Sequence, residues 1–155
     1  MVSRQDFRKA MAALPAAVNI ITTAGPAGCH GMTATAVCSV SDDPASLLVC
    51  INKSARIHDV LLANGRFCVN VLAAGQDDVS TAFATYALSI EERLERAGGV
   101  VAMDDGQPAL AQAQVALACR IAQVMEVGTH SIFIGGAEQV APGLGLGALI
   151  TGVPA

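Results

Sequence analysis

The chain has 155 residues, of which 53% are hydrophobic and 14% charged, and its formal net charge is −4. The basic residues are scattered, which argues against nucleic-acid binding, and no apolar run reaches the ~20 residues that span a bilayer. The N-terminus has no long apolar segment of the kind found in secretory signals. We therefore expect one cytoplasmic domain over residues 1–155, with part of its weakly charged surface covered by a second copy of the chain.

In chain order, the first predicted element is a helix over Asp6–Leu14, where apolar residues recur every three or four positions. Pro15 ends this helix. Six later segments have the β-branched, apolar or alternating composition of strands. They are Ala17–Thr23, Gly31–Ser41, Ala45–Ile51, Arg66–Leu72, Val115–Val127 and Ser131–Val140. We expect the first three strands to be consecutive and antiparallel.

Short helices are predicted between the later strands. A polar loop leads into one that ends at Gly65, a second helix or ordered loop covers Gly75–Tyr86, and a third begins with the capping box of Ser89 and Glu92. Residues 128–130 make a turn before the last strand. Because helices do not alternate regularly with strands, the pattern favours a small antiparallel barrel with peripheral helices over a parallel sheet.

The segment Gly31–Ser41 alternates between two kinds of residue, which a single strand would direct to opposite faces. One face is small and apolar, and the other has four hydroxyl groups. These are the side chains of Thr33, Thr35, Ser39 and Ser41. Hydroxyls donate and accept hydrogen bonds, so this face suits a polar-edged ligand. On the alternation alone, an ordinary solvent-exposed face rich in hydroxyls is the favoured explanation.

The segment Cys50–His58 ends a strand and continues into a turn with a serine and two cations, shortly before a helix N-terminus. These groups bind phosphate in many proteins, although an ordinary strand-to-helix loop is the alternative. His130 is either a surface turn residue or a hydrogen-bond donor beside a cofactor. No serine occupies a nucleophile elbow, so we expect no catalytic triad.

The cysteines are odd in number and contain no Cys-x-x-Cys pair. They are Cys29, Cys38, Cys50, Cys68 and Cys119. We expect buried free thiols that act as small hydrophobes, and neither a metal site nor a disulfide framework.

The segments "FRKAMAALPAAVNIITT" and "GMTATAVCSVSDDPASLLVCINKSARIHDVLLANGRFCVNVLAAGQDDVSTAFA" together resemble the flavin reductase-like family of the FMN-binding split-barrel fold. The reductase components of two-component flavin monooxygenases are the most similar, among them the 4-hydroxyphenylacetate 3-monooxygenase and pyrimidine-utilisation reductases. The likeness continues more loosely through "VGTHSIFIGGAEQV". It implies a six-stranded antiparallel Greek-key split barrel with short peripheral helices.

The resemblance also implies a homodimer that transfers hydride from NADH or NADPH to FMN or FAD and supplies reduced flavin to a partner monooxygenase. It places His130 near the flavin and the nicotinamide, where it would orient the nicotinamide or stabilise charge on reduced flavin rather than act as a general base. It places the other flavin-contacting positions on three segments. These are Thr33, Ala34, Thr35, Ser39, Val40 and Ser41; Cys50, Asn52, Lys53, Ser54 and Ala55; and Phe83.

The C-terminal segment Gly143–Ala155 departs from the family, because it lacks the basic and aromatic residues with which relatives end. This departure leaves open a first alternative, a non-catalytic flavin store or sensor of the same fold. A second alternative, which does not depend on the tail, is a split-barrel oxidase of a vitamin-B6 phosphate. The second would need a more basic phosphate pocket. The choice between FMN and FAD, and between NADH and NADPH, stays open.

Overall fold

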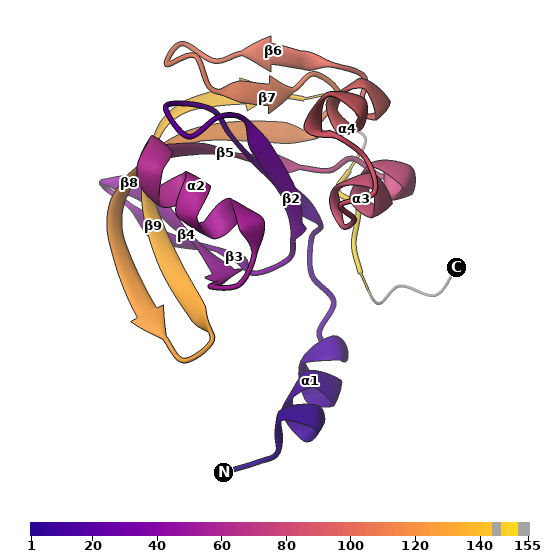
Figure 1. The fold of residues 1–155 in the computed structure, drawn as a ribbon, viewed down its shortest axis with the longest axis vertical. Coiled ribbons are helices and arrows are strands. Elements are labelled where there is room, and N and C mark those ends of the chain that lie inside the picture. The colour runs from indigo at the N-terminus through magenta and orange to yellow at the C-terminus, as the bar shows by residue number, and fades with distance from the viewer. Residues whose placement is uncertain (144–146, 152–155) are drawn as a thin grey trace.

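Antiparallel strands form the body of the protein in the computed structural model, which describes residues 1–143 and 147–151 (Figure 1). Seven strands of the described residues join in one sheet. They are β1 (Asn19–Thr23), β2 (His30–Ala34), β3 (Val37–Asp42), β4 (Ala45–Asn52), β5 (Arg66–Val71), β8 (Val115–Val127) and β9 (His130–Pro142). A separate hairpin of β6 (Val100–Ala102) and β7 (Pro108–Leu110) lies outside that sheet. These two strands were not predicted, because three residues are too few to show a period.

The order of strands in the large sheet is β2-β1-β5-β8-β9-β4-β3. The two edge strands, β2 and β3, are separated in the chain only by Thr35 and Ala36. Such a short link requires the sheet to curl until its edges approach each other, which produces a barrel. The predicted fold class, a mainly β antiparallel barrel with short helices, is therefore confirmed.

The prediction of one continuous strand over residues 31–41 is wrong. The segment leaves the sheet edge beside β1 at Ala34 and joins the opposite edge beside β4 at Val37. A register shift follows between Ser39 and Ser41. Each change of path resets which side chains face the core, so the four hydroxyls do not form one face. The predicted antiparallel pairing of consecutive segments is confirmed, because β1 pairs with β2 and β3 pairs with β4.

Four helices are present in the described residues, and each overlaps a predicted one, although the first starts and ends two residues earlier than the predicted Asp6–Leu14. They are α1 (Arg4–Ala12), α2 (Arg56–Asn64), α3 (Asp77–Phe83) and α4 (Ile90–Arg96). Gly65 ends α2 with φ = 73°, a left-handed conformation that favours glycine. The capping box of Ser89 and Glu92 begins α4. None of these helices is long and apolar enough to cross a membrane.

The helix α1 differs from the others because it stands away from the barrel (Figure 1) and buries none of its residues. Its N-cap Ser3 accepts a hydrogen bond from the backbone of Asp6 at 3.0 Å, so the helix is locally well formed. Its apolar residues Phe7 and Met11 are 55% and 46% exposed. The periodicity that predicts this helix therefore does not reflect packing on the chain's own core.

The barrel interior is filled by alternate residues of its strands. Ile51 of β4, Phe67 of β5 and Phe133 of β9 are fully buried there. A second apolar cluster, which includes Phe83, packs beneath α3 and α4. Cys68 and Cys119 are buried as predicted, Cys119 in the barrel interior and Cys68 in a separate cluster with Met103 and Ala109. The prediction of buried thiols is wrong for Cys29 and Cys38, which are exposed.

Part of the unusual C-terminal segment joins the barrel. Ala148 forms an isolated bridge with Ala73, and Ile150 forms one with Ala17. The hydroxyl of Thr151 accepts from the backbone of Ala16 at 3.0 Å. The described part of the tail therefore adds an extended segment beside β1 and β5. The remaining tail positions, residues 144–146 and 152–155, lie outside the described residues.

Candidate functional site

One wall of the candidate site is the outer face of β4 and β9. Burial alternates along both strands, with Ile51 and Ser131 fully buried and their neighbours directed outward. Asn52 pairs with His130, and two residues further along the strands Cys50 pairs with Ile132. Cross-strand partners lie about 5 Å apart at Cβ. A polar pair and an apolar pair therefore lie side by side on one surface.

The loop that follows β4 is a compact turn held by the Asn52 side chain. Its Oδ1 accepts from the backbone N–H of Ser54 at 2.9 Å and from the Ser54 hydroxyl at 2.8 Å. The backbone N–H of Lys53 donates to the carbonyl of Thr129 at 2.9 Å, which ties the loop to the start of β9. The Lys53 ammonium pairs with Glu126 at 3.3 Å. This turn places a serine hydroxyl, an amide and a cation at the end of the β4–β9 wall.

The helix α1 forms the opposite wall, and two cavities lie between it and the barrel. The polar cavity has a volume of 790 Å³ and is lined by Arg4, Phe7, Arg8, Asn52, Lys53, Ser54, Thr129 and His130. The apolar cavity has a volume of 910 Å³ and is lined by Phe7, Met11, Ala12, Leu14, Ala16, Thr35, Ala36, Cys50, Val127, His130, Ile132 and Thr151. Both volumes are within the range of small-molecule sites. Because the two cavities share Phe7 and His130, they form one elongated groove.

His130 lies where the two cavities meet. It is the first residue of β9 rather than the last residue of a turn, which corrects the predicted boundary by one position. Its Nδ1 lies 2.8 Å from the Thr129 hydroxyl, and its side chain is exposed. The ring is therefore available to a ligand in either cavity.

Six of the predicted site residues line the groove. They are Thr35, Cys50, Asn52, Lys53, Ser54 and His130. Burial raises the pKa of the Cys50 thiol, and the nearby Cys38 raises it further. Cys50 is therefore a neutral wall residue rather than a thiolate nucleophile. Ala55 lies just beyond the lining residues, as the N-cap of α2.

The other predicted residues do not line the groove. The hydroxyl of Thr33 donates to the carbonyl of Ser80 at 2.6 Å, and Ala34 is buried in the barrel core. Phe83 is 3% exposed and packs so closely on β2 that a Cβ at Gly31 would lie 2.7 Å from its ring. The structure therefore uses these three positions for packing and local hydrogen bonding.

Three predicted site residues belong to β3, which is an edge strand of the sheet. They are Ser39, Val40 and Ser41. Val40 is 48% exposed, and the Ser41 hydroxyl accepts from the backbone of Asp43 at 3.2 Å. Ser39 and Ser41 pair with Leu47 and Ser46 near the start of β4, whereas the groove is lined by the other end of that strand, at Cys50 and Asn52.

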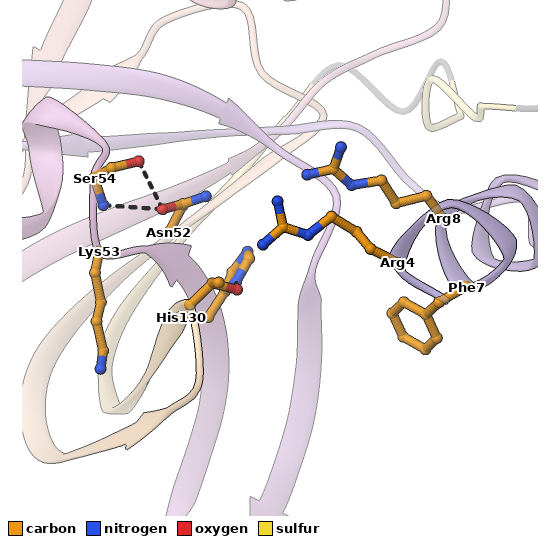
Figure 2. A pocket seen from close by; sticks show the side chains of 8 residues that line it. Arg4, Phe7, Arg8, Asn52, Lys53, Ser54 and His130 are labelled. Atoms are coloured by element: carbon orange, nitrogen blue, oxygen red, sulfur yellow. Dashed lines mark hydrogen bonds between the residues drawn. The ribbon is translucent and has the colours of Figure 1, made fainter. Parts of the chain in front are cut away.

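The sequence interpretation missed Arg4 and Arg8, which extend from α1 toward Asn52 and His130 (Figure 2). It also missed Phe7 as a groove residue, because an apolar residue at helical spacing predicts core packing. One signal was available: Arg4 and Arg8 are four positions apart, so they share one face of the helix. What they face depends on the tertiary structure.

The shape and chemistry of the groove fit a flavin nucleotide. The apolar cavity offers Ala36, Cys50 and Ile132 as a wall for a planar ring, and the polar cavity offers guanidinium and amide donors for a phosphate. No Asp or Glu is among the described residues that line either cavity. The charge distribution therefore suits an anionic ligand with one apolar end.

Comparison with known proteins also points to a flavin-binding protein. Residues 11–148 match the family described as flavin reductase like domain. The FMN reductase (NADH) RutF of Pseudomonas syringae pv. syringae (strain B728a) is 52% identical over 132 residues, which cover 84% of this chain and 72% of that protein. The RutF of Escherichia coli O6:K15:H31 is 46% identical over 140 residues, covering 90% of this chain and 84% of the relative.

Solved structures share the fold over nearly the whole chain. A crystal structure of a Haemophilus somnus 129PT protein has a TM-score of 0.91 at 41% identity, covering 97% of this chain and 95% of that one. The NADH:FAD oxidoreductase SgcE6 of Streptomyces globisporus C-1027, in complex with NAD and FAD fragments, has a TM-score of 0.86 at 30% identity, with 97% and 91% covered. BorF, the flavin reductase component of a bacterial two-component tryptophan halogenase, has a TM-score of 0.87 at 29% identity, with 96% and 93% covered. The chain belongs to the flavin reductase-like domain family.

Proposed function

We propose that the protein is an NADH-dependent FMN reductase, with residues 1–155 acting as one domain. The observation that supports this most directly is the groove between α1 and the barrel, which has an apolar cavity next to a cationic one. The named relatives at about half identity are NADH-dependent FMN reductases. Of the flavins and nicotinamides that the sequence left open, the relatives favour FMN and NADH.

The residues of the groove meet the needs of this reaction. A bound flavin supplies the hydride-accepting ring, so the protein needs to orient two planar rings and to stabilise charge rather than to provide an acid–base pair. Thr35, Cys50 and Ile132 would contact the ring, and Asn52, Lys53 and Ser54 would bind the phosphate side. His130, at the junction of the two cavities, would orient the nicotinamide or stabilise charge on reduced flavin.

The remaining predicted positions stay part of the proposal as residues of a wider flavin surface. Thr33, Ala34, Ser39, Val40, Ser41, Ala55 and Phe83 make up this group. They belong to β2, to β3 or to the helices beside them, so a ligand would reach them only by extending beyond the groove. Alanine substitution of Ser39 and of Asn52 separates the two groups, since only the second lines the groove.

We further propose that the protein is a homodimer. Phe7 and Met11 on α1, Leu14 just after it and Val127 at the end of β8 are exposed, and all four border the apolar cavity. A second copy that packs on this surface would remove it from water. Light scattering at micromolar concentration should give the dimer mass, and replacement of both Phe7 and Met11 by Asp should shift the mass toward the monomer. A monomer mass for the unaltered chain would contradict the proposal.

The product of the reaction, reduced flavin, indicates the role of the protein. Free reduced flavin is a diffusible two-electron donor, so we propose that the protein serves a separate flavin-dependent monooxygenase in the cytoplasm, where NADH is supplied. Among the structural relatives, BorF is the flavin reductase component of a two-component system that contains a tryptophan halogenase.

The decisive experiment for the enzyme assignment is a steady-state assay of NADH oxidation. When FMN is added, the purified protein should accelerate the oxidation of NADH. It should accelerate the oxidation of NADPH less. His130→Ala should lower kcat with little change in the Kd of FMN. A protein that binds FMN and never accelerates NADH consumption would be a flavin store or sensor, and the reductase proposal would fail.

A further inference from the structure

The helix α1 positions two cations at the polar cavity without contributing to the core. Arg4 and Arg8 lie one turn apart on the same face of the helix, and both line the cavity. None of the residues of α1 is buried, so core packing does not explain why these two side chains extend toward the barrel. Figure 2 shows both guanidinium groups directed toward Asn52 and His130.

These two charges are not neutralised by the protein. Across residues 1–143 and 147–151, no carboxylate lies within ion-pair distance of Arg4 or Arg8. Lys53, the cation predicted for the phosphate loop, is instead paired with Glu126 at 3.3 Å. Its side chain points away from those of Asn52 and Ser54 (Figure 2). The free positive charge of this cavity therefore comes mainly from α1.

The residues that line the opposite wall of the same cavity are polar and include no carboxylate. The Asn52 amide group and the hydroxyl of Ser54 belong to the turn after β4, and the His130 ring lies beside them. Two guanidinium groups facing a hydroxyl and an amide suit a compact anion with several acceptor oxygens, because guanidinium binds phosphate in a bidentate manner. A phosphate monoester has two negative charges near neutral pH, which matches the two arginines.

We propose that Arg4 and Arg8 bind the terminal phosphate of FMN and select FMN over riboflavin, which lacks that phosphate. This inference rests on the proposed function for the identity of the ligand. In the bound state the phosphate links α1 to the turn at Asn52–Ser54, and the apolar cavity next to it receives the ring. The phosphates of NADH offer the same chemistry, so the experiment must separate the two sources.

The test measures the affinity of FMN and of riboflavin by flavin fluorescence titration. In the double variant Arg4→Gln/Arg8→Gln, the Kd of FMN should rise at least about tenfold, whereas the Kd of riboflavin should change less than about twofold. Lys9→Gln is the matched control for Arg8→Gln, because it removes one charge from the same turn at a residue that does not line the cavity. This control should leave both affinities unchanged.

Three results would overturn the proposal. These are an unchanged Kd for FMN in the double variant, an equal loss for FMN and riboflavin, and a raised KM for NADH with an unchanged Kd for FMN. Because α1 buries no residue, the double variant should keep the melting temperature of the unaltered protein. If the unaltered protein binds FMN but does not oxidise NADH, the reductase proposal fails while the phosphate contact is still tested by the titration.

Discussion

The link between His58 and Ser131 joins α2 to the strand that begins at His130. The Ser131 hydroxyl lies 2.8 Å from His58 Nε2, and His58 Nδ1 lies 3.0 Å from a carboxylate oxygen of Asp59. A carboxylate only accepts, so Nδ1 donates to Asp59, and in the neutral ring Nε2 accepts from Ser131. Ser131 is fully buried, which excludes it as a nucleophile open to substrate. We expect this hydrogen bond to stabilise the fold.

The substitution Ser131→Ala removes the hydroxyl and leaves His58 Nε2 without its partner. His58 is 6% exposed, and its ring makes an edge contact with the Phe133 ring, with the two centroids 5.4 Å apart, so water does not easily replace the lost donor. An unsatisfied buried acceptor costs about 1–3 kcal/mol, and we expect the free energy of unfolding to fall by that amount. Urea unfolding measures the change, with an unchanged m-value as evidence that the unfolding transition is the same.

The matched control is Ser46→Ala, a serine-to-alanine change in the same sheet. The Ser46 hydroxyl donates to the carbonyl of Pro44 at 3.2 Å in an exposed setting, where water can take its place. Its cost should stay within about 0.5 kcal/mol. If Ser131→Ala is no more destabilising than Ser46→Ala at the same protein concentration, the buried hydrogen bond does not contribute as described.

Three further predictions address the site, the barrel and the thiols. Ser54→Asp places a negative charge beside the proposed phosphate and should weaken FMN binding by about 1 kcal/mol or more, at least about fivefold in Kd; the neutral isostere Ser54→Asn is the control, and equal Kd values for the two variants would contradict the assignment. Gly135→Ala should destabilise the protein by about 1–3 kcal/mol, because the new Cβ would lie 2.8 Å from the Phe67 ring, whereas a Cβ at Gly136 meets nothing within 4 Å; equal melting temperatures for the two variants would refute this reading of the core. Burial raises the pKa of Cys68 and of Cys119 to about 12, so both should stay unlabelled by iodoacetamide at pH 8 while the exposed Cys38 reacts; mass spectrometry of the native and the denatured protein checks the order.

The sequence predicted well the features that depend on local chemistry. Gly65 ends α2 because it readily adopts the left-handed conformation after the helix. The capping box that begins α4 spans only the four residues from Ser89 to Glu92. The boundaries of β8 are the predicted ones, Val115–Val127. Each of these signals lies within a short stretch of sequence, so no tertiary information was needed.

The errors arose where the tertiary structure decides. The alternation of residues 31–41 continues through Thr35 and Ala36, and nothing in it shows that the chain changes from one sheet edge to the other there. The contribution of Arg4 and Arg8 was missed for the same reason, since the turn that faces them lies more than forty positions away in sequence, at residues 52–54. The groove is built from segments that are distant in the chain. Only the loop after β4 could be predicted as part of the site from its own short stretch of sequence.

The most direct test of the proposed reaction is an anaerobic single-turnover experiment. The protein is mixed with FMN and one equivalent of NADH in the absence of oxygen, and the visible absorbance of oxidised flavin is followed with time. The proposal predicts that this absorbance disappears together with that of NADH, much faster than in a mixture without protein, and that the Arg4→Gln/Arg8→Gln variant needs more FMN to reach the same rate. An absorbance that decays no faster than in the protein-free mixture, with FMN shown to be bound, would contradict the assignment of the protein as a reductase.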